Sequence, residues 1–142
     1  QHYLRLDGTD TWRAQAALGL RYDASLGSST EYGFQHGYRP RRPFDDAFVV
    51  FPLTVMEQAL PPVGADGAAV AGEFDRLLDE AAANDAVMTA LWHPRYFNDE
   101  EFPGYRGAYR RLVEDALDRG AWVGPPAEFY DRLVAAANAR LA

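Results

Sequence analysis

Histidine is the side chain most readily adjusted for proton transfer near neutral pH, and the chain has three, His2, His36 and His93. His93 follows six uncharged residues, 87–92, and precedes Pro94. Such a run predicts a strand buried on both faces, and Pro94, which has no N–H to donate, predicts where it ends. In sheets of parallel strands this C-terminal edge is where ligands and catalytic groups lie. His93 is therefore a candidate functional residue, and the alternative is that it only caps a strand by hydrogen-bonding a neighbouring loop.

Other common catalytic signatures are absent from the sequence. It has no glycine-rich phosphate loop, no Gly-x-Ser-x-Gly turn, no His-Glu-x-x-His pair and no calcium loop. The three histidines are far apart in the chain, so their spacing does not indicate a metal site. Cysteine is absent, which excludes disulfide bonds and thiolate zinc sites. The residues alone thus give no complete catalytic set.

A long irregular connection, residues 27–43, carries a local cluster of basic side chains. The cluster consists of Arg39, Arg41 and Arg42. Long loops in compact domains are often functional, so the cluster is a candidate site for an anionic ligand. The alternative is a solvated loop paired with nearby acids such as Asp45 and Asp46.

The elements before this loop predict part of a parallel sheet. They are a strand at residues 2–6, a helix at 12–18 and a strand at 20–26. The turn Asp7-Gly8 ends the first strand, and Gly19 closes the helix. Asp23 falls near the end of the second strand, on the rim predicted for His93. Strand, helix, strand is the order of a parallel βαβ unit.

Beyond the loop, strands and helices continue to alternate. A buried strand over residues 48–56 is broken by Pro52, and apolar residues at helical spacing predict the helices. The remaining elements are expected at 68–85 (helix), 87–92 (strand), 105–119 (helix), 121–124 (strand) and 126–141 (helix). The helix 105–119 is expected to bury Tyr109, Leu112, Val113, Ala116 and Leu117. We therefore predict a single α/β domain over residues 1–142.

The charge composition restricts the partners. The chain has 14 basic residues, all arginine, and 21 acidic ones, which gives a formal net charge of −7. Such a surface repels nucleic acid and anionic lipid. No run approaches the roughly 20 apolar residues of a membrane span, so we expect a soluble protein without a membrane span or a nucleic-acid partner. An acidic surface without lysine also fits the cytoplasm of a halophile, because carboxylates stay hydrated at high salt.

The order of these segments resembles the C-terminal half of a polysaccharide deacetylase, of the NodB-homology type in carbohydrate esterase family 4. Four segments carry the resemblance over nearly the whole chain: His2-Tyr3-Leu4-Arg5; residues 19–27 with Gly33-Phe34; Phe51-Pro52-Leu53; and Leu91-Trp92-His93-Pro94 with Gly120-Ala121-Trp122. The resemblance implies a partial deformed (β/α) barrel, with parallel strands and with helices packed outside. It also implies hydrolysis of acetyl groups from amino sugars or acetylated glycans, with zinc or another divalent metal in the intact parent enzyme.

The resemblance implies roles for individual residues. Leu91 and His93 match the family's Leu-x-His motif, in which the leucine lines the acetyl pocket and the histidine is the general acid for the leaving amine or alcohol. Trp92, which lies between them, is expected to bind substrate. Tyr3 matches the aromatic residue of the Arg-x-Pro-Tyr motif, whose backbone N–H stabilises the oxyanion. Asp23 falls near the acidic residue that braces the arginine of that motif.

The chain departs from the family pattern at several points. The motif arginine would precede Gln1, His2 stands where the family has proline, and the Asp-Trp ending of the fourth motif is missing. The catalytic-base aspartate, the metal-binding aspartate and the His-x-x-x-His pair belong to the N-terminal half of the family's domain and are not found in this sequence. Without them no metal is held and no water is activated. We therefore expect neither a metal site nor deacetylase activity in these 142 residues alone.

A half barrel would leave open sheet edges, and such edges pair readily with other strands. We expect the chain to form a homodimer or to pair with the missing N-terminal half. Two other interpretations stay open. One is a non-catalytic carbohydrate-binding or scaffold module, whose aromatic residues stack on sugar rings: Tyr3, Trp92, Tyr96 and Phe97. The other is an unrelated α/β domain in which His93 is structural.

Overall fold

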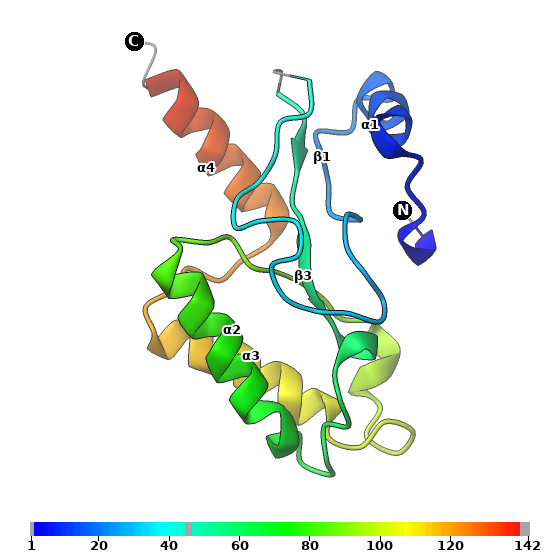
Figure 1. Cartoon of the computed structure of the whole chain (residues 1–142), viewed down its shortest axis with the longest axis vertical. Helices are drawn as coiled ribbons and strands as arrows, with labels where there is room; N and C mark the ends of the chain where they lie inside the picture. Colours follow the sequence, from blue (N-terminus) through cyan, green and yellow to red (C-terminus); the bar gives the residue numbers. More distant parts are fainter. Residues whose placement is uncertain (1, 45–46, 140–142) are drawn as a thin grey trace.

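The computed structural model describes residues 2–44 and 47–139, the last three by their backbone alone. Helices and short strands are mixed along the chain (Figure 1). The helices are α1 (Gly8–Ala17), α2 (Ala71–Ala83), α3 (Tyr105–Asp118) and α4 (Pro126–Ala139). Short 3-10 turns are η1 (His2–Leu4), η2 (Glu57–Ala59), η3 (Ala68–Val70) and η4 (Pro94–Phe97). The strands are β1 (Tyr22–Asp23), β2 (Val49–Val50), β3 (Leu53–Met56) and β4 (Thr89–Leu91).

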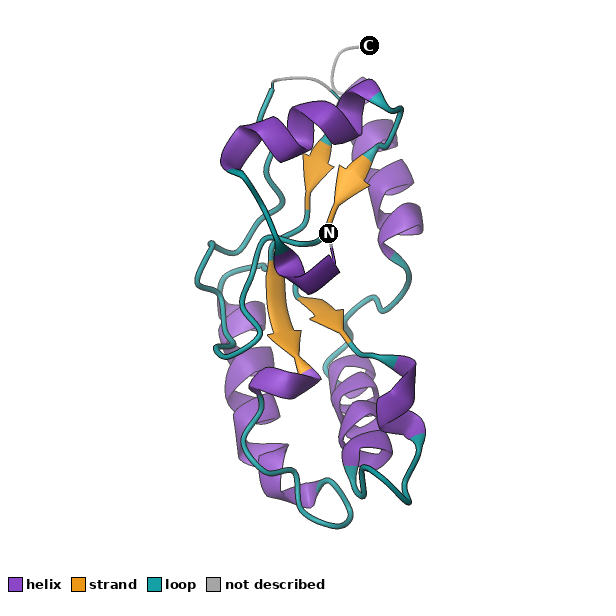
Figure 2. Cartoon of the chain, turned by 90° about the vertical axis from the view of Figure 1, so that its right-hand side faces the viewer, coloured by secondary structure: helices purple, strands orange, loops and turns teal. Residues whose placement is uncertain are grey.

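The strands form two parallel pairs, β1 with β2 and β3 with β4, which lie one above the other in Figure 2. β2 and β3 are two parts of one extended stretch. Pro52, which has no N–H for a ladder, lies between them. Before the break, the Phe51 N–H donates to the Asp23 carbonyl at 2.8 Å, and after it the Leu53 N–H donates to the Leu26 carbonyl at 2.8 Å. The predicted break at Pro52 is therefore confirmed.

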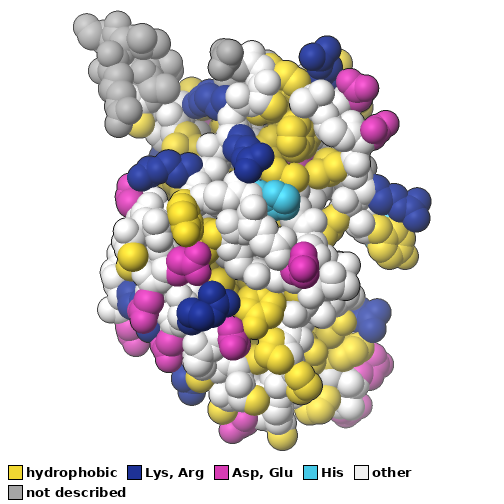
Figure 3. All heavy atoms as spheres, viewed as in Figure 1, with side chains coloured by type: hydrophobic (Ala, Val, Ile, Leu, Met, Phe, Trp, Pro, Cys, Tyr) yellow, Lys and Arg dark blue, Asp and Glu magenta, His cyan; other side chains and the backbone are white. Residues whose placement is uncertain are grey.

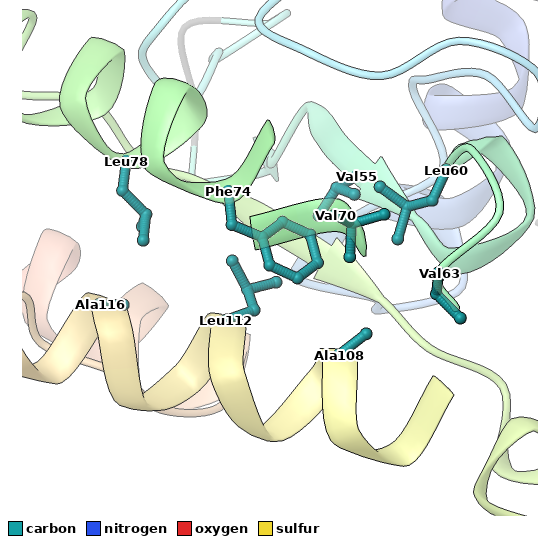
Figure 4. Packing of buried hydrophobic residues seen from close by; sticks show 9 residues of the cluster. All are labelled: Val55, Leu60, Val63, Val70, Phe74, Leu78, Ala108, Leu112 and Ala116. Carbon is teal, nitrogen blue, oxygen red and sulfur yellow. The ribbon is translucent and has the colours of Figure 1, made fainter. Parts of the chain in front are cut away.

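Helices α2 and α3 pack against each other and against β3 to form the main hydrophobic core. Figure 4 shows the ring of Phe74, from α2, directed towards Leu112 of α3. Phe74 is fully buried, and burying a side chain of this size contributes about 1.5–3 kcal/mol. The core consists of Val55, Leu60, Val63, Val70, Phe74, Leu78, Ala108, Leu112 and Ala116. The two amphipathic helices expected at 68–85 and 105–119 are confirmed, the first as η3 followed by α2.

The inward face of α3 differs from the expected one. Its buried residues are Ala108, Leu112 and Ala116, which recur every fourth residue. Tyr109 and Val113, which were expected to be buried, are only half-buried, and Leu117 is 52% exposed. Leu112 and Ala116 are buried as expected, but the helix is turned so that Ala108 joins them and Leu117 does not. This leaves a second apolar stripe at the edge of the core.

A smaller cluster joins the β1–β2 pair to α4. Val49, Phe51 and Tyr130 are its buried members. Outside it, Arg21 and Asp131 form an ion pair at 2.9 Å. The helix predicted at 126–141 is confirmed as far as Ala139, where the described residues end. No helix in the described ranges is long and apolar enough to cross a membrane.

Two predicted strands are wrong. Residues 2–6 begin with η1 because Tyr3 and Leu4 adopt left-handed backbone conformations, with φ of 56° and 53°, which a strand cannot contain. Residues 121–124 form no strand, since no other described segment pairs with them. Their Trp122 instead stacks on Phe129 of α4, with ring centroids 5.6 Å apart. The strand expected at 20–26 is present only as the two residues of β1.

The strand that precedes His93 also differs from the prediction. β4 is half-buried at Thr89 and Leu91 and exposed at Ala90, rather than buried on both faces. Among the described strands it pairs only with β3, so it is an edge strand. The described strands form two short parallel sheets and no closed barrel.

Candidate active site

The ends of β3 and β4 bring two polar side chains together. The strands are parallel and pair Met56 with Leu91, their last residues. Glu57 follows β3 directly, and His93 follows β4 after one intervening residue. Because parallel strands end at the same edge of a sheet, both residues leave the sheet side by side. The His93 Nδ1–H donates to Glu57 Oε1 at 2.5 Å, and the His93 backbone N–H donates to Oε2 at 3.3 Å.

Glu57 is fully buried, whereas the His93 side chain is 39% exposed. A buried carboxylate is costly unless its oxygens accept hydrogen bonds, and here each oxygen accepts one from His93. The bond to Nδ1 fixes the orientation of the imidazole ring and leaves Nε2 as the ring nitrogen that can exchange a proton. The arrangement is thus a histidine with a fixed ring, accessible on one side and backed by a buried carboxylate.

The strand geometry separates Leu91 from Trp92. Side chains alternate along a strand, so Leu91 and His93 share one face and Trp92 lies on the other. Trp92 packs against the core, with its ring 5.5 Å from that of Tyr109 and 6.3 Å from that of Tyr105. Its Nε1–H is buried without an acceptor among the described residues. The structure therefore places Trp92 on the face of α3, and alternation along an extended backbone assigns Leu91 to the other face, with His93.

Aromatic side chains surround the pair on the side of η4 and α3. Tyr96 is buried, with its ring 6.5 Å from that of His93 and 4.8 Å from that of Tyr105. Burial raises the pKa of the Tyr105 hydroxyl, and the neighbouring Tyr96 and Glu57 raise it further. Glu57 is fully buried beside this cluster. Because Tyr96 and Trp92 pack inward, two of the four aromatic residues expected to stack on sugars belong to the core.

Asp23 lies at the end of β1, away from this pair. Asp23 pairs with Val50 in the β1–β2 sheet. Val50 and Glu57 lie at opposite ends of an extended stretch that is on the order of 20 Å long. The Asp23 carboxylate is buried and accepts hydrogen bonds from Gln15 Nε2 at 2.9 Å and from the Ser25 N–H and hydroxyl at 2.9 and 2.8 Å. Burial alone would raise the pKa of Asp23, but these hydrogen bonds outweigh it and hold the pKa below its usual value. The expectation that Asp23 and His93 share one rim is therefore wrong.

Tyr3 makes its ring contacts within its own segment, and no ring contact joins it to His93 in the described part of the chain. Its side chain is 78% exposed, and its ring lies 4.0 Å from that of His2, with the Arg5 guanidinium 5.8 Å above it. The oxyanion role that the resemblance implies for its backbone N–H stays a prediction.

The basic loop is tied to the rest of the fold by its arginines. Arg39 forms an ion pair with Asp85 at 2.9 Å, and the Arg41 guanidinium donates to the His36 carbonyl. Asp45 and Asp46, the partners suggested by the sequence, lie outside the described residues. Arg39 and Arg41 thus have structural partners within the protein.

Glu57 is the site residue that the sequence analysis missed. Its signal resembles that of His93, a polar side chain directly after a buried strand. Applying the same rule to the strand 48–56 would have found it. The described residues contain no group of three or more His, Asp or Glu side chains placed to hold a metal ion.

Comparisons with protein-family models, with curated proteins and with solved structures find no match to this chain.

Proposed function

We propose that the chain is the C-terminal part of a metal-dependent carbohydrate deacetylase, in which His93 protonates the leaving amine or alcohol. The observation that supports this most is the Glu57–His93 pair at the ends of two parallel strands. A buried carboxylate that fixes an accessible imidazole is an arrangement suited to general acid–base catalysis. The matching Leu-x-His motif gives this proton transfer its reaction class.

The geometry indicates how the proton would move. Glu57 accepts from Nδ1, so Nε2 faces the substrate and carries the proton to be transferred. When the tetrahedral intermediate collapses, its C–N or C–O bond breaks and Nε2 gives its proton to the departing amine or alkoxide. The carboxylate stabilises the imidazolium that exists before this transfer. Leu91, on the same strand face, would contact the acetyl methyl group.

Deacetylation also needs an activated water, which a divalent metal, usually zinc, supplies in this class of enzyme. The described residues do not gather a ligand set for it. We propose that an N-terminal half provides these ligands and the catalytic base, and that it pairs with the open edge of β4 to extend a partial (β/α) barrel. In this proposal the 142 residues alone bind no catalytic metal and release no acetate.

The test is acetate release from N-acetylchito-oligosaccharides and from O-acetylated xylan, in the presence of Zn²⁺. The proteins compared are the 142-residue chain and the longest polypeptide that contains it. We expect turnover in the second alone, and loss of that turnover on chelation of the metal. Sugar binding without turnover in both proteins would contradict the proposal and support the carbohydrate-binding module. The absence of both sugar binding and turnover in both proteins would support an unrelated domain.

A further inference from the structure

Helix α3 carries an apolar stripe beside the one that packs on α2. It consists of Tyr109, Val113 and Leu117, which recur every fourth residue and so form a single ridge on the helix surface. Exposure increases along this ridge, from half-buried at Tyr109 and Val113 to 52% exposed at Leu117. Apolar ridges left open on a helix are typical of surfaces that bind another protein.

The ridge forms one wall of a shallow groove of about 270 Å³. The groove is lined by Phe97, Arg106, Tyr109, Arg110, Val113 and Glu114. It therefore combines an apolar centre with a charged rim, which is the usual composition of a protein interface. Phe97 packs edge-on against Tyr109, with ring centroids 5.2 Å apart, and so holds the apolar centre in place.

The charges of the rim follow a fixed order along α3. A second ridge, parallel to the apolar one, carries Arg106, Arg110, Glu114 and Asp118. Its N-terminal half is basic and its C-terminal half is acidic. Arg106 pairs with Asp99 at 3.3 Å, but Arg110 and Glu114 form no ion pair with any described residue. The two residues nearest the middle of the ridge are thus available to a partner.

We propose that this surface binds α3 of a second copy of the chain, in an antiparallel two-fold arrangement. A two-fold axis perpendicular to the helices brings the same flank of both helices together and reverses their directions. Arg110 of one copy then meets Glu114 of the other, twice in the dimer, while the apolar ridges pack between them. A parallel arrangement would put the charged ridges on opposite flanks and lose these pairs.

The test is sedimentation equilibrium of the full 142-residue chain at roughly 5–500 µM. A single helix face buries a small area, so we expect a reversible dimer with a Kd of about 10–100 µM. Arg110→Glu and Glu114→Arg each place like charges together, and each should weaken the dimer at least about tenfold. The double variant, and an equimolar mixture of the two single variants, should both restore association.

Arg111→Glu is the matched control, because Arg111 is exposed on the opposite side of the helix and undergoes the same charge change. Its dimer should equal that of the original chain. Circular dichroism spectra of the variants are compared with that of the original chain to check that each variant is folded. A monomer over the whole concentration range would overturn the proposal. A dimer that persists in both Arg110→Glu and Glu114→Arg would also overturn it. The same holds if the single variants are monomers and neither the double variant nor the mixture associates.

Discussion

At the scale of single residues, the structure depends on two buried carboxylates that serve different ends. Glu57 accepts hydrogen bonds from His93 alone among the described residues, and His93 is partly exposed. Asp23 accepts from Gln15 and Ser25, both of which are buried. The first carboxylate is therefore linked to the surface through a titratable group, which suits catalysis. The second stabilises the fold.

Glu57→Gln should destabilise the protein by about 1–3 kcal/mol, because the new amide NH₂ would face an N–H donor of His93 in a buried site. Glu101→Gln, on an exposed loop, is the control and should change the free energy of unfolding by less than about 0.5 kcal/mol. Urea unfolding at pH 7 measures both. Equal stability of the two variants would show that Glu57 does not depend on its bonds to His93.

Asp23→Asn should change how stability depends on pH. Since the pKa of Asp23 is lowered in the folded state, its ionised form stabilises the fold above about pH 4. This contribution is lost as pH falls from the unfolded pKa, near 3.8, towards the lower folded value. The variant should be less stable than the original chain at pH 7 and should lose less stability between pH 5 and acid. Urea unfolding across this range tests it, and parallel curves for the two proteins would contradict it.

Residue types alone identified His93 but could not identify its partner. A histidine after a strand is conspicuous in a sequence with three histidines, whereas Glu57 is one of 21 acidic residues. Its place directly after the strand 48–56 makes it a candidate, but only the pairing of β3 with β4 shows that it meets His93. The prediction that Asp23 shares a rim with His93 failed because it placed the strands 20–26 and 87–92 in one sheet, whereas β1 and β4 belong to separate pairs.

At the scale of elements, glycines allow two segments of backbone to meet. The loop before η3 crosses the first turn of α3, and a Cβ atom on Gly107 would lie within 3.0 Å of the Asp66 carbonyl oxygen. A Cβ atom on Gly67 would likewise lie within 3.0 Å of the Ala108 nitrogen. Gly67 also has a φ of 77°, which other residues rarely adopt. This crossing fixes where α3 begins relative to α2.

Gly107→Ala should therefore destabilise the protein by more than about 1 kcal/mol, although alanine is the better helix former. Gly72→Ala, in the first turn of α2, is the matched control because nothing lies within 4 Å of its added Cβ atom. That substitution should stabilise by up to about 1 kcal/mol. Thermal unfolding of both variants shows whether each substitution lowers or raises the stability. If both stabilise, the backbones do not meet at Gly107.

Helices were more predictable than strands. The apolar spacing of α2 and α3 is set by local sequence, and both helices lie where their pattern indicates. A strand forms only where another strand lies beside it. Residues 2–6 and 121–124 therefore form no strand, although their residue types favour one. The spacing of apolar residues did not predict which face of α3 is buried. Both Ala108 and Leu117 fit the helical spacing, but only Ala108 is buried.

At the scale of the whole molecule, acidic side chains outnumber basic ones, 21 to 14. Figure 3 shows Asp and Glu side chains gathered on the lower left, over α2. Because the net charge is −7, the acidic side chains within one folded molecule repel one another at low salt. Several of its ion pairs, such as that of Arg119 with Asp75 at 2.6 Å, offset only part of this repulsion.

We expect stability to rise with salt, because added ions screen this repulsion. Between 0.1 and 2 M KCl the Tm should increase by at least about 3 °C, the shift that about 1 kcal/mol produces in a domain of this size. Scanning calorimetry at several salt concentrations measures it. A Tm that does not change with salt would count against the expectation that this acidic surface is suited to high salt.

The most direct test of the proposed proton donor compares two substrates that differ in their leaving group. An N-acetylchito-oligosaccharide releases an amine that needs a proton, whereas 4-nitrophenyl acetate releases a stable phenolate. In the longest polypeptide that contains these residues, His93→Ala should lower kcat/KM for the first about 10²–10⁴-fold and for the second by less than about threefold. An equal loss for both substrates, or no loss for either, would contradict the role of His93 as the proton donor.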